Sequence, residues 1–512
     1  MDSQAANSTG AEQPYPKSLL GSLILLVTSI FFKLYNQLDA DYDLWWHIFF
    51  GQENLAKGTV ETFDVYSFTA SGQLYINHEW LSEIFLGAIY GIGGQTALII
   101  WRWCMVLAIL WFGFRLIRRK AQNDLNKIII FLLFGLTLSP GISFRIHLFS
   151  YLFLLILMNL IDASLAEKKF PPVVPVSILL LLWANFHGAF ILGLGIWFVY
   201  TFENFFLRKP FRTDFIAILA LLLPGALTIV NPYGAGLWYY IAEVLVNNPL
   251  SSQYITEWQR FSFAPREIPF FIVFVLTWLA YFTSGKEKKF SETILLILAS
   301  AMGLAAVRNT PLFVILSLPC MADHIDAGLR RLYSHTRRTK PVSDSMALVS
   351  AIGIVCLSFF FFVKGVPDRW QIVMDKDPLP VQTVSFIKAN DLKGNLWVPL
   401  HYGGYVLFHL YPGIRVSIDG RMEMVYPRDV VKATMTFAYQ GTRKKWKKIL
   451  HQYGADFALV EKDNPAVAEM EADPDWFWLF AEKDTALLVR KAYITSAQRT
   501  FQIPPKKPFS FP

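Results

Sequence analysis

Three carboxylates and a histidine stand close together near the N-terminus of this 512-residue chain. The string Asp-Ala-Asp-Tyr-Asp-Leu-Trp-Trp-His, from Asp39 to His47, directly follows an apolar stretch. Acids at this spacing repel each other, which favours keeping at least one of them protonated, paired with a cation or bound to a metal. A carboxylate in such surroundings can act as a general base. The alternative is a group of solvated acids, with Trp45 and Trp46 as an anchor at a membrane interface.

A second polar group, Asn77-His78-Glu79-Trp80, opens a segment expected to be helical. Asn77 suits a helix N-cap, and Glu79 in the first turn suits the helix dipole. These structural roles leave His78 unexplained. With the acids of the first segment, His78 and Glu79 could hold a divalent cation, although the spacing matches no specific metal motif. A divalent cation is therefore a possible cofactor, with its ligands left open.

A third group is cationic, and each member lies near the end of an apolar segment: Arg102, Arg145, His147, His187 and Arg308. Arginine matches phosphate oxygens with a bidentate fork. Any single one could simply reach a lipid headgroup, which is the interpretation favoured for Arg102. Several cations around one acidic loop indicate a site for an anionic lipid or a phosphate ester.

Two further motifs favour structural roles. Asn231-Pro-Tyr-Gly234 is typical of a turn. Asp419-Gly-Arg421 follows a strand-like run, where open α/β sheets place ligands, but we expect an Asp-Gly turn with an Asp419–Arg421 ion pair. The sequence has no phosphate-binding loop, dinucleotide fingerprint or nucleophile elbow, so soluble nucleotide cofactors are not indicated.

The elements that position these residues are membrane helices. The chain is 54% hydrophobic, and blocks such as 128–138 carry no charge. The core of a water-soluble protein cannot bury so many uninterrupted apolar helices, whereas a lipid bilayer can. We expect a polytopic α-helical membrane protein with about eleven spans. They are placed at 18–36, 97–117, 127–140, 147–163, 173–187, 189–207, 214–230, 268–284, 291–307, 309–322 and 345–364.

Basic residues set the expected topology. They follow every even-numbered span: Arg118, Arg119 and Lys120; Lys168 and Lys169; Arg208, Lys209 and Arg212; Lys286, Lys288 and Lys289; Arg330, Arg331, Arg337, Arg338 and Lys340. The positive-inside rule then places residues 1–17 in the cytoplasm and the C-terminal region outside. The net charge of +8 is thus explained by topology and not by nucleic acid. A span at 78–94 would invert this pattern, so that segment is predicted to lie along the outer interface, within a long first outer loop at 37–96.

The C-terminal residues 366–497 are predicted to form a soluble α/β domain, with 498–512 as a loose tail. Strand-like runs occur at Leu396–Leu400, Tyr405–Leu410, Ile414–Ile418, Phe457–Val460, Trp476–Phe480 and Ala486–Val489. The last two are predicted to form a hairpin. A helical segment near Val430–Tyr453 separates the two groups of strands.

The acidic turn after the first span, the long outer loop and the outer C-terminal domain resemble the GT-C superfamily of glycosyltransferases, near bacterial relatives of protein mannosyltransferases and aminoarabinose transferases. The strings that carry the resemblance are Asp41-Tyr-Asp-Leu-Trp-Trp-His47, His78-Glu-Trp-Leu81, Trp183-Ala-Asn-Phe-His-Gly188, Asn231-Pro-Tyr-Gly234, Arg308-Asn309 and Asp419-Gly-Arg421. The resemblance implies a polyprenyl-phosphate-linked sugar donor and an acceptor hydroxyl on the outer face. Relatives often carry a second acid in a later outer loop, where this chain has Arg145 and His147.

We therefore expect a glycosyltransferase of the bacterial inner membrane, working with the bilayer, a polyprenyl-phosphate-linked sugar and an acceptor glycan, lipid or protein. The expected catalytic residues are Asp43, Asp41, Glu79 and His78, and the expected phosphate-binding residues are Arg145, His187, Arg308, His47 and His147. Two alternatives remain: a transporter, and a non-catalytic lipid-binding or envelope-assembly protein with a GT-C-like fold.

Overall fold

A computed structural model describes residues 15–167, 172–207, 215–247, 254–335, 344–367, 370–374, 379–440, 445–495 and 501–503. Most of the predicted N-terminal segment 1–17 and of the tail 498–512 lies outside these ranges. So do eight of the basic residues used to predict topology: Lys168, Lys169, Arg208, Lys209, Arg212, Arg337, Arg338 and Lys340.

Each predicted span falls on an apolar helix of the described chain. These helices are α1 (Lys17–Tyr35), α3 (Trp80–Lys120), α4 (Asp124–Leu138), α5 (His147–Ala166), α6 (Val173–Phe186), α7 (Phe190–Phe202), α8 (Phe215–Leu227), α11 (Ile268–Thr283), α12 (Phe290–Ala305), α13 (Thr310–His335) and α14 (Asp344–Gly365). Seven helices among the described residues are long and apolar enough to cross a membrane, and four more apolar helices have 10–17 residues. The protein is therefore a polytopic α-helical membrane protein.

Helix α3 joins two segments that the sequence predicts separately. It runs for 41 residues, but Gly93 and Gly94 have non-helical backbone angles. The segment before this break corresponds to the predicted interfacial helix, and the segment after it to the second predicted span. That the segment before the break lies along the outer membrane interface stays a prediction.

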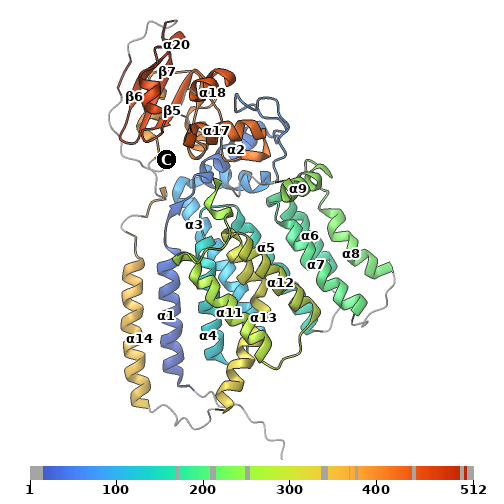
Figure 1. Ribbon diagram of the computed structural model, residues 1–512. Coiled ribbons are helices and arrows are strands. Elements are labelled where there is room, and N and C mark those ends of the chain that lie inside the picture. Colours follow the sequence, from blue (N-terminus) through green and yellow to red (C-terminus); the bar gives the residue numbers. More distant parts are fainter. Residues whose placement is uncertain are drawn as a thin grey trace, which may run out of the picture. The chain divides into compact units, whose positions relative to one another are not determined.

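The chain divides into two compact units, each described here by itself. The first comprises Met1–Gln37, Ile109–Ile142 and Arg260–Trp370. Within it, α1 packs along α14, and α13 packs against α4, α11 and α12 (Figure 1). The outward side chains of α14 are large and apolar, such as Ile352, Phe359 and Phe360, as expected for a surface that meets lipid.

The second unit comprises Leu38–Ala108, Ser143–Gln259 and Gln371–Pro512. It holds α5 to α8, α9 (Gly236–Asn247) and a helix that the sequence analysis did not predict, α2 (Asp43–Lys57). Helices α2 and α3 cross where Gly51 meets Gly87. A Cβ on Gly51 would lie 1.9 Å from the Glu83 carbonyl oxygen, so only glycine permits this approach. One turn before each glycine lie His47 and Glu83, which the crossing brings face to face.

The C-terminal part of the second unit contains a mixed five-stranded sheet. Its order is β4 (Ile414–Val416), β3 (Gly394–Trp397), β5 (Phe457–Glu461), β7 (Thr485–Arg490) and β6 (Trp476–Ala481). Strand β3 is parallel to β4 and β5, whereas β7 is antiparallel to β5 and β6. The predicted hairpin is thus confirmed as β6–β7. A separate parallel pair joins β1 (Asp39–Ala40) to β2 (Val373–Met374).

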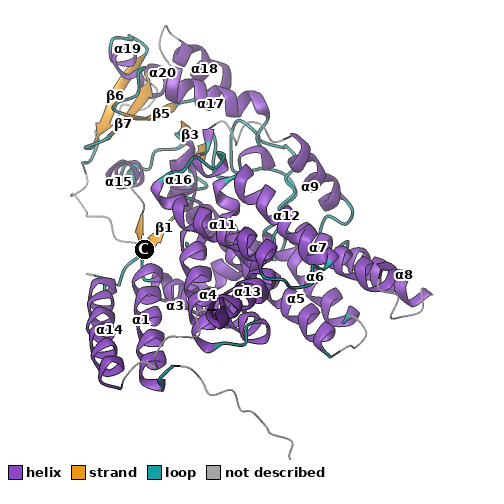
Figure 2. Cartoon of the chain, turned by 60° about the horizontal axis from the view of Figure 1, so that its bottom comes forward, coloured by secondary structure: helices purple, strands orange, loops and turns teal. Residues whose placement is uncertain are grey.

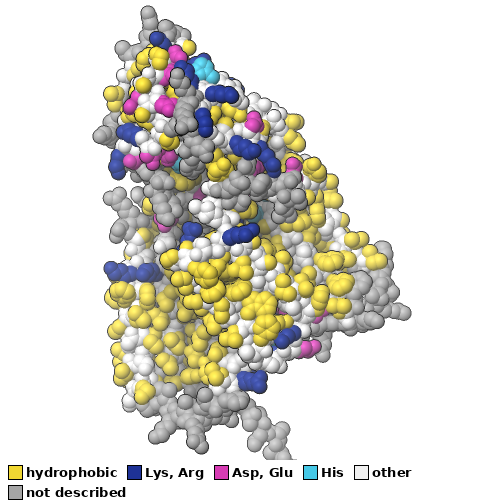
Figure 3. Space-filling model, viewed as in Figure 1, with side chains coloured by type: hydrophobic (Ala, Val, Ile, Leu, Met, Phe, Trp, Pro, Cys, Tyr) yellow, Lys and Arg dark blue, Asp and Glu magenta, His cyan; other side chains and the backbone are white. Residues whose placement is uncertain are grey.

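Helices accompany this sheet (Figure 2): α15 (Val381–Ala389), α16 (Gly403–Leu410), α17 (Arg428–Gln440), α18 (Lys445–Tyr453), α19 (Val467–Glu471) and α20 (Lys491–Thr495). Phe437 and Trp446, on α17 and α18, share a buried core with Trp397 and Leu488 of the sheet. The predicted strand Tyr405–Leu410 is wrong, because this run forms α16. In Figure 3, charged side chains gather on the sheet domain, whereas apolar side chains dominate the helices.

The first predicted outer loop packs against this domain. The N–H of Phe68 donates to the Val416 carbonyl at 3.1 Å, which extends the pairing of the β4 edge. Trp45 lies 5.0 Å from the Tyr405 ring, between ring centroids. Trp45 and Trp46 are 0% and 3% exposed, so their interpretation as interfacial anchors is wrong. They hold α2 on the C-terminal domain instead.

Candidate active site

Asp41 and Asp43 lie at the N-terminal end of α2. The N–H of Asp43 donates to Asp41 Oδ1 at 2.9 Å, which satisfies one of the free donors of the first helical turn. The helix dipole favours negative charge at this end. Asp43 Oδ1 in turn accepts a hydrogen bond from Trp46 Nε1 at 3.1 Å. Both carboxylates are therefore fixed by the local fold of the helix start.

Arg145 supplies the cation for these acids. Its Nη2 donates to Asp41 Oδ2 and lies 3.5 Å from Asp43 Oδ2, and its Nη1 donates to Glu257 Oε2 at 2.7 Å. Arg145 precedes α5, and Glu257 lies on the short helix Thr256–Trp258. We call Asp41, Asp43, Arg145 and Glu257 the Arg145 cluster. Arg145, the predicted phosphate-binding residue, thus lies against Asp43, the predicted base. Both of its Nη atoms are paired with carboxylates.

The two aspartates differ in their electrostatics. Burial alone would raise the pKa of Asp41, but the charge of Arg145 and hydrogen bonds from Asp43 and Arg145 outweigh it and hold the pKa below its usual value. Burial and the neighbouring Asp41 charge raise the pKa of Asp43 to about 6. Asp41 is therefore the charged partner of Arg145. Asp43, whose pKa lies nearer to neutral, is the better general base.

The C-terminal domain closes one side of Asp43. A Cβ on Gly420 would lie 2.2 Å from Trp46 Nε1 and 2.8 Å from Asp43 Oδ1. The backbone of Gly420 therefore packs directly on the Trp46–Asp43 hydrogen bond, and a larger side chain there would displace it.

A buried ion-pair network anchors that turn. Arg421 donates to Asp419 through Nε at 2.9 Å and through Nη2 at 2.8 Å, and its Nη2 lies 2.7 Å from Asp64 Oδ1. The guanidinium carbon lies 4.5 Å from the centre of the Phe50 ring. All three charged residues are fully buried. The predicted Asp419–Arg421 pair is confirmed, and Asp64 extends it into a link between the first loop and the turn that contacts Asp43.

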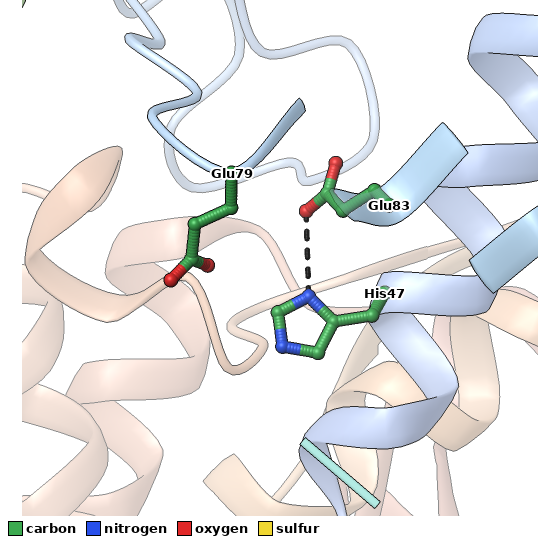
Figure 4. Close-up of side chains that lie close together, drawn as sticks. All are labelled: His47, Glu79 and Glu83. Carbon is green, nitrogen blue, oxygen red and sulfur yellow. Dashed lines mark ion pairs between the residues drawn. The ribbon is translucent and has the colours of Figure 1, made fainter. Parts of the chain in front are cut away.

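A second group of candidate site residues lies where α2 crosses α3. His47 Nδ1 is 3.5 Å from Glu83 Oε1, and the carboxylates of Glu83 and Glu79 flank the His47 ring (Figure 4). Asn77 Nδ2 donates to Glu83 Oε2 at 2.5 Å, and Asn77 Oδ1 accepts from the N–H of Glu79 at 3.0 Å. We call His47, Glu79 and Glu83 the His47 cluster. Asn77 thus holds the Glu83 carboxylate, and its Oδ1 makes the hydrogen bond expected of an N-cap, to the N–H two residues on, just before α3 begins at Trp80.

Two more predicted residues adjoin Glu79. His78 Nε2 and His187 Nε2 each lie 3.4 Å from Glu79 Oε1. His187 Nδ1 is 2.9 Å from Ser150 Oγ, which fixes the imidazole of His187. Burial alone would raise the pKa of Glu79, but His78, His47 and His187 outweigh it and keep that carboxyl ionised. Burial lowers the pKa of His47, but Glu83 and Glu79 outweigh it and raise the pKa above its usual value.

Among the described residues, one group of side chains has its possible ligand atoms close enough together to hold a metal ion. One atom each from His47, Glu79 and Glu83 lie within 4.8 Å of one another, and all three residues are buried. Glu79 and Glu83 are four positions apart in the sequence, and His47 lies 32 positions before Glu79; this spacing matches no common metal motif.

The remaining predicted residues lie elsewhere. His147, the first residue of α5, lies with its ring 5.0 Å from that of Tyr151. Arg308, on the short helix Val307–Asn309, belongs to the first unit, so its role at the site stays a prediction. Arg102 is 1% exposed and lies over the Phe144 ring, so its interpretation as a headgroup contact is wrong.

Sequence reasoning missed Glu83 as a site residue and left Glu257 without a role. Glu83 follows Glu79 by four residues on a helical segment, a spacing that puts both on one face. That spacing is present in the sequence, although the sequence analysis predicts only an interfacial helix for this segment. Glu257 lies far from Arg145 in sequence, so only the fold reveals their pairing.

Solved glycosyltransferase structures share this fold. The apo oligosaccharyltransferase of Archaeoglobus fulgidus is 12% identical, with a TM-score of 0.53 over 86% of this chain and 69% of that chain. The same organism's oligosaccharyltransferase AglB, in complex with an inhibitory peptide and a dolichol-phosphate, is 13% identical, with a TM-score of 0.50 over 87% of this chain and 69% of that chain. The mycobacterial arabinofuranosyltransferase AftD is 14% identical, with a TM-score of 0.51 over 92% of this chain and 40% of that chain.

No protein-family model matches the chain, and no curated protein matches its sequence. The structural likeness nevertheless defines the class of fold: this chain has the GT-C fold of membrane glycosyltransferases, as the sequence resemblance predicts.

Proposed function

We propose that this protein is a glycosyltransferase that moves a sugar from a polyprenyl-phosphate donor to an acceptor hydroxyl on the outer face of a bacterial inner membrane. The observation that carries the proposal is the Arg145 cluster, at a helix start directly after the first predicted span, within a GT-C fold. The N-terminus would be cytoplasmic and the C-terminal domain periplasmic. The acceptor would be a glycan, a lipid or a protein.

Asp43 would act as the general base. The acceptor hydroxyl oxygen attacks the anomeric carbon of the sugar, its proton passes to Asp43, and the bond between that carbon and the phosphate oxygen breaks. The polyprenyl phosphate leaves with both bonding electrons. A carboxylate with a raised pKa can hold the proton that the acceptor loses, so the environment of Asp43 suits this role better than that of Asp41.

Arg145 would serve both the base and the donor phosphate. Its guanidinium holds Asp41 charged, and its side chain is only partly buried, at 17% exposure. A charge-assisted contact from this guanidinium would stabilise the phosphate as negative charge develops on it. Arg308, His187, His47 and His147 are the further phosphate-binding candidates from the sequence. A structure of similar fold holds a dolichol-phosphate, which supports a polyprenyl phosphate as the donor carrier.

The test is donor consumption by the purified full-length protein in lipid nanodiscs. The donors are undecaprenyl-phosphate-linked sugars with a radiolabelled sugar, and an extract of bacterial membrane lipids supplies acceptors. Wild type should move the label to a new product. Asp43→Asn should reduce the rate by about 10²- to 10⁴-fold, the usual contribution of a general base.

Asp39→Asn is the matched control, because Asp39 is an exposed acid of strand β1, four positions before Asp43, that lies outside the Arg145 cluster. Its rate should stay near that of wild type. Equal rates in wild type and Asp43→Asn would remove the proposed base. Absence of label transfer from every donor, in protein that binds the donors, would favour the non-catalytic lipid-binding alternative.

A further inference from the structure

The His47 cluster has an arrangement that points to a ligand of its own. It holds an imidazole and two carboxylates with donor atoms within 4.8 Å of one another, all buried. We propose that His47, Glu79 and Glu83 bind a divalent first-row metal ion of the zinc or manganese kind. Metal binding can be measured without a sugar donor, so this proposal does not rest on the transferase activity.

The separation of the two innermost donor atoms fits shared coordination. His47 Nδ1 and Glu83 Oε1 lie 3.5 Å apart. Two ligand atoms that are each about 2.1 Å from a tetrahedral metal ion are about 3.4 Å from each other. The fold therefore holds these atoms at the ligand–ligand separation of a small metal ion, and a carboxylate oxygen of Glu79 lies within 4.8 Å of the donor atoms of both residues.

The same two atoms have no other use. Neither His47 Nδ1 nor Glu83 Oε1 has a hydrogen-bond partner among the described residues. His47 and Glu83 are 3% and 0% exposed, so bulk water cannot supply the missing hydrogen bonds. A buried polar atom without a partner costs about 1–3 kcal/mol. A metal ion between these atoms would satisfy both at once.

The surroundings resemble the supporting shell of a metal site. Asn77 donates to Glu83 Oε2, which leaves Oε1 directed at His47, and it also accepts from the backbone of Glu79. His78 and His187 lie beside Glu79 Oε1. Such outer contacts orient ligands in known metal sites and are commonly needed for full affinity.

The donor set selects among metals. One imidazole and two carboxylates suit zinc or manganese, whereas calcium prefers six to eight oxygen ligands. With three protein ligands, a tetrahedral ion keeps one position for water or for an oxygen of a bound substrate.

The experiment measures bound metal on full-length protein in detergent. Chelator-treated protein is dialysed against a micromolar concentration of free Zn²⁺, or of Mn²⁺ in a parallel sample, and the bound metal is quantified by mass spectrometry. Wild type should retain about one equivalent, as in other sites with three protein ligands. The isosteric variant Glu83→Gln, and His47→Gln as a second variant, should each bind at least tenfold more weakly.

Asp41→Asn and Glu257→Gln are the controls, because they remove acids of the Arg145 cluster. They should retain metal like wild type. Co²⁺ gives an independent readout: its visible absorption should appear in wild type, disappear on addition of Zn²⁺ and be absent in Glu83→Gln. Size-exclusion profiles establish that each variant is folded.

Three results would overturn the proposal. Wild type could retain no metal, which would leave a protonated His47 as the partner of both acids. Wild type and Glu83→Gln could retain equal amounts. Alternatively, the metal could be lost in Asp41→Asn and kept in Glu83→Gln, which would assign it to the Arg145 cluster.

Discussion

Two groups of carboxylates in the same structural unit balance their charge in different ways. In the Arg145 cluster, one guanidinium contacts all three acids. In the His47 cluster, two buried acids face imidazoles and the neutral amide of Asn77, and two donor atoms lack hydrogen-bond partners among the described residues. A permanent cation in the first cluster makes a metal ion unnecessary there. Its absence in the second is what makes a metal ion the natural partner.

The difference also suits the two proposed chemical tasks. A base must exchange a proton near neutral pH, and Asp43 can do so because Asp41 takes the stronger interaction with Arg145. Ligands of a metal must stay deprotonated and fixed. Asn77 holds one oxygen of the Glu83 carboxylate and the backbone N–H of Glu79. The four predictions below test this difference, starting with the largest effect.

Removal of the permanent cation should have the largest effect. Arg145→Met leaves three neighbouring carboxylates without a counter-charge, and it removes a donor from the proposed phosphate site. We expect sugar transfer to fall by about 10²- to 10³-fold, the cost of losing one such donor. Arg145→Lys should recover part of this loss, since it restores charge but not the bidentate geometry. Rates of label transfer in nanodiscs give the comparison, and a wild-type rate in Arg145→Met would refute the role.

Loss of the Asn77 side-chain amide should weaken metal binding by the His47 cluster and leave the Arg145 cluster unaffected. Asn77→Ala frees Glu83 Oε2 and the backbone of Glu79, so metal affinity should fall by about 10- to 100-fold. Competition titrations with a fluorescent zinc chelator measure this affinity. Ser262→Ala, a hydroxyl in the other structural unit, is the control and should leave the affinity unchanged. Unaltered affinity in Asn77→Ala would show that the amide does not orient the ligands.

A methyl group at Gly420 should disturb the first cluster alone. The added Cβ would overlap Trp46 Nε1 and press on Asp43 Oδ1, so the carboxylate must move. Misplacement of a catalytic group by about 1 Å can cost up to about 10²-fold, so we expect a loss of about 10- to 100-fold in turnover. Gly91→Ala within α3 has open space around its Cβ and serves as the control for handling and folding. Full turnover in Gly420→Ala would show that the contact of the C-terminal domain with Asp43 does not affect catalysis.

The pH dependence of transfer should report Asp43. A base works only when deprotonated, so the rate should fall as the pH drops through about 6, the raised pKa of this carboxyl. Asp41→Asn removes a negative charge that raises that pKa, so the acidic limb should move to lower pH, by about one unit. Rates from pH 4.5 to 8 in wild type and in Asp41→Asn supply the test. A limb that moves to higher pH would contradict the assignment of Asp43.

Much of the membrane fold could be predicted from sequence, because long uncharged apolar runs have few alternatives to a membrane helix. Short runs were harder. The segment Tyr405–Leu410 is apolar enough for a strand, yet it folds as α16, since a six-residue apolar run does not distinguish the two structures. Helix α2 was missed because its start, with two acids and two tryptophans, resembles a loop at an interface.

The candidate site was only partly predictable for a related reason. Residue type indicated that Asp41, Asp43, His78 and Glu79 could do chemistry, and the structure brings His187 beside Glu79. Which cation meets which acid depends on contacts between distant segments. Arg145 and Glu257, or His47 and Glu83, meet only because particular helices cross, and the Gly51–Gly87 crossing has no signature that a single sequence reveals.

The most direct test measures bound metal and sugar transfer on the same preparations of Asp43→Asn and Glu83→Gln. Our account predicts that Asp43→Asn keeps about one equivalent of metal and loses transfer, whereas Glu83→Gln loses the metal. It is contradicted if Asp43→Asn transfers sugar at the wild-type rate, or if Asp43→Asn loses the metal while Glu83→Gln keeps it.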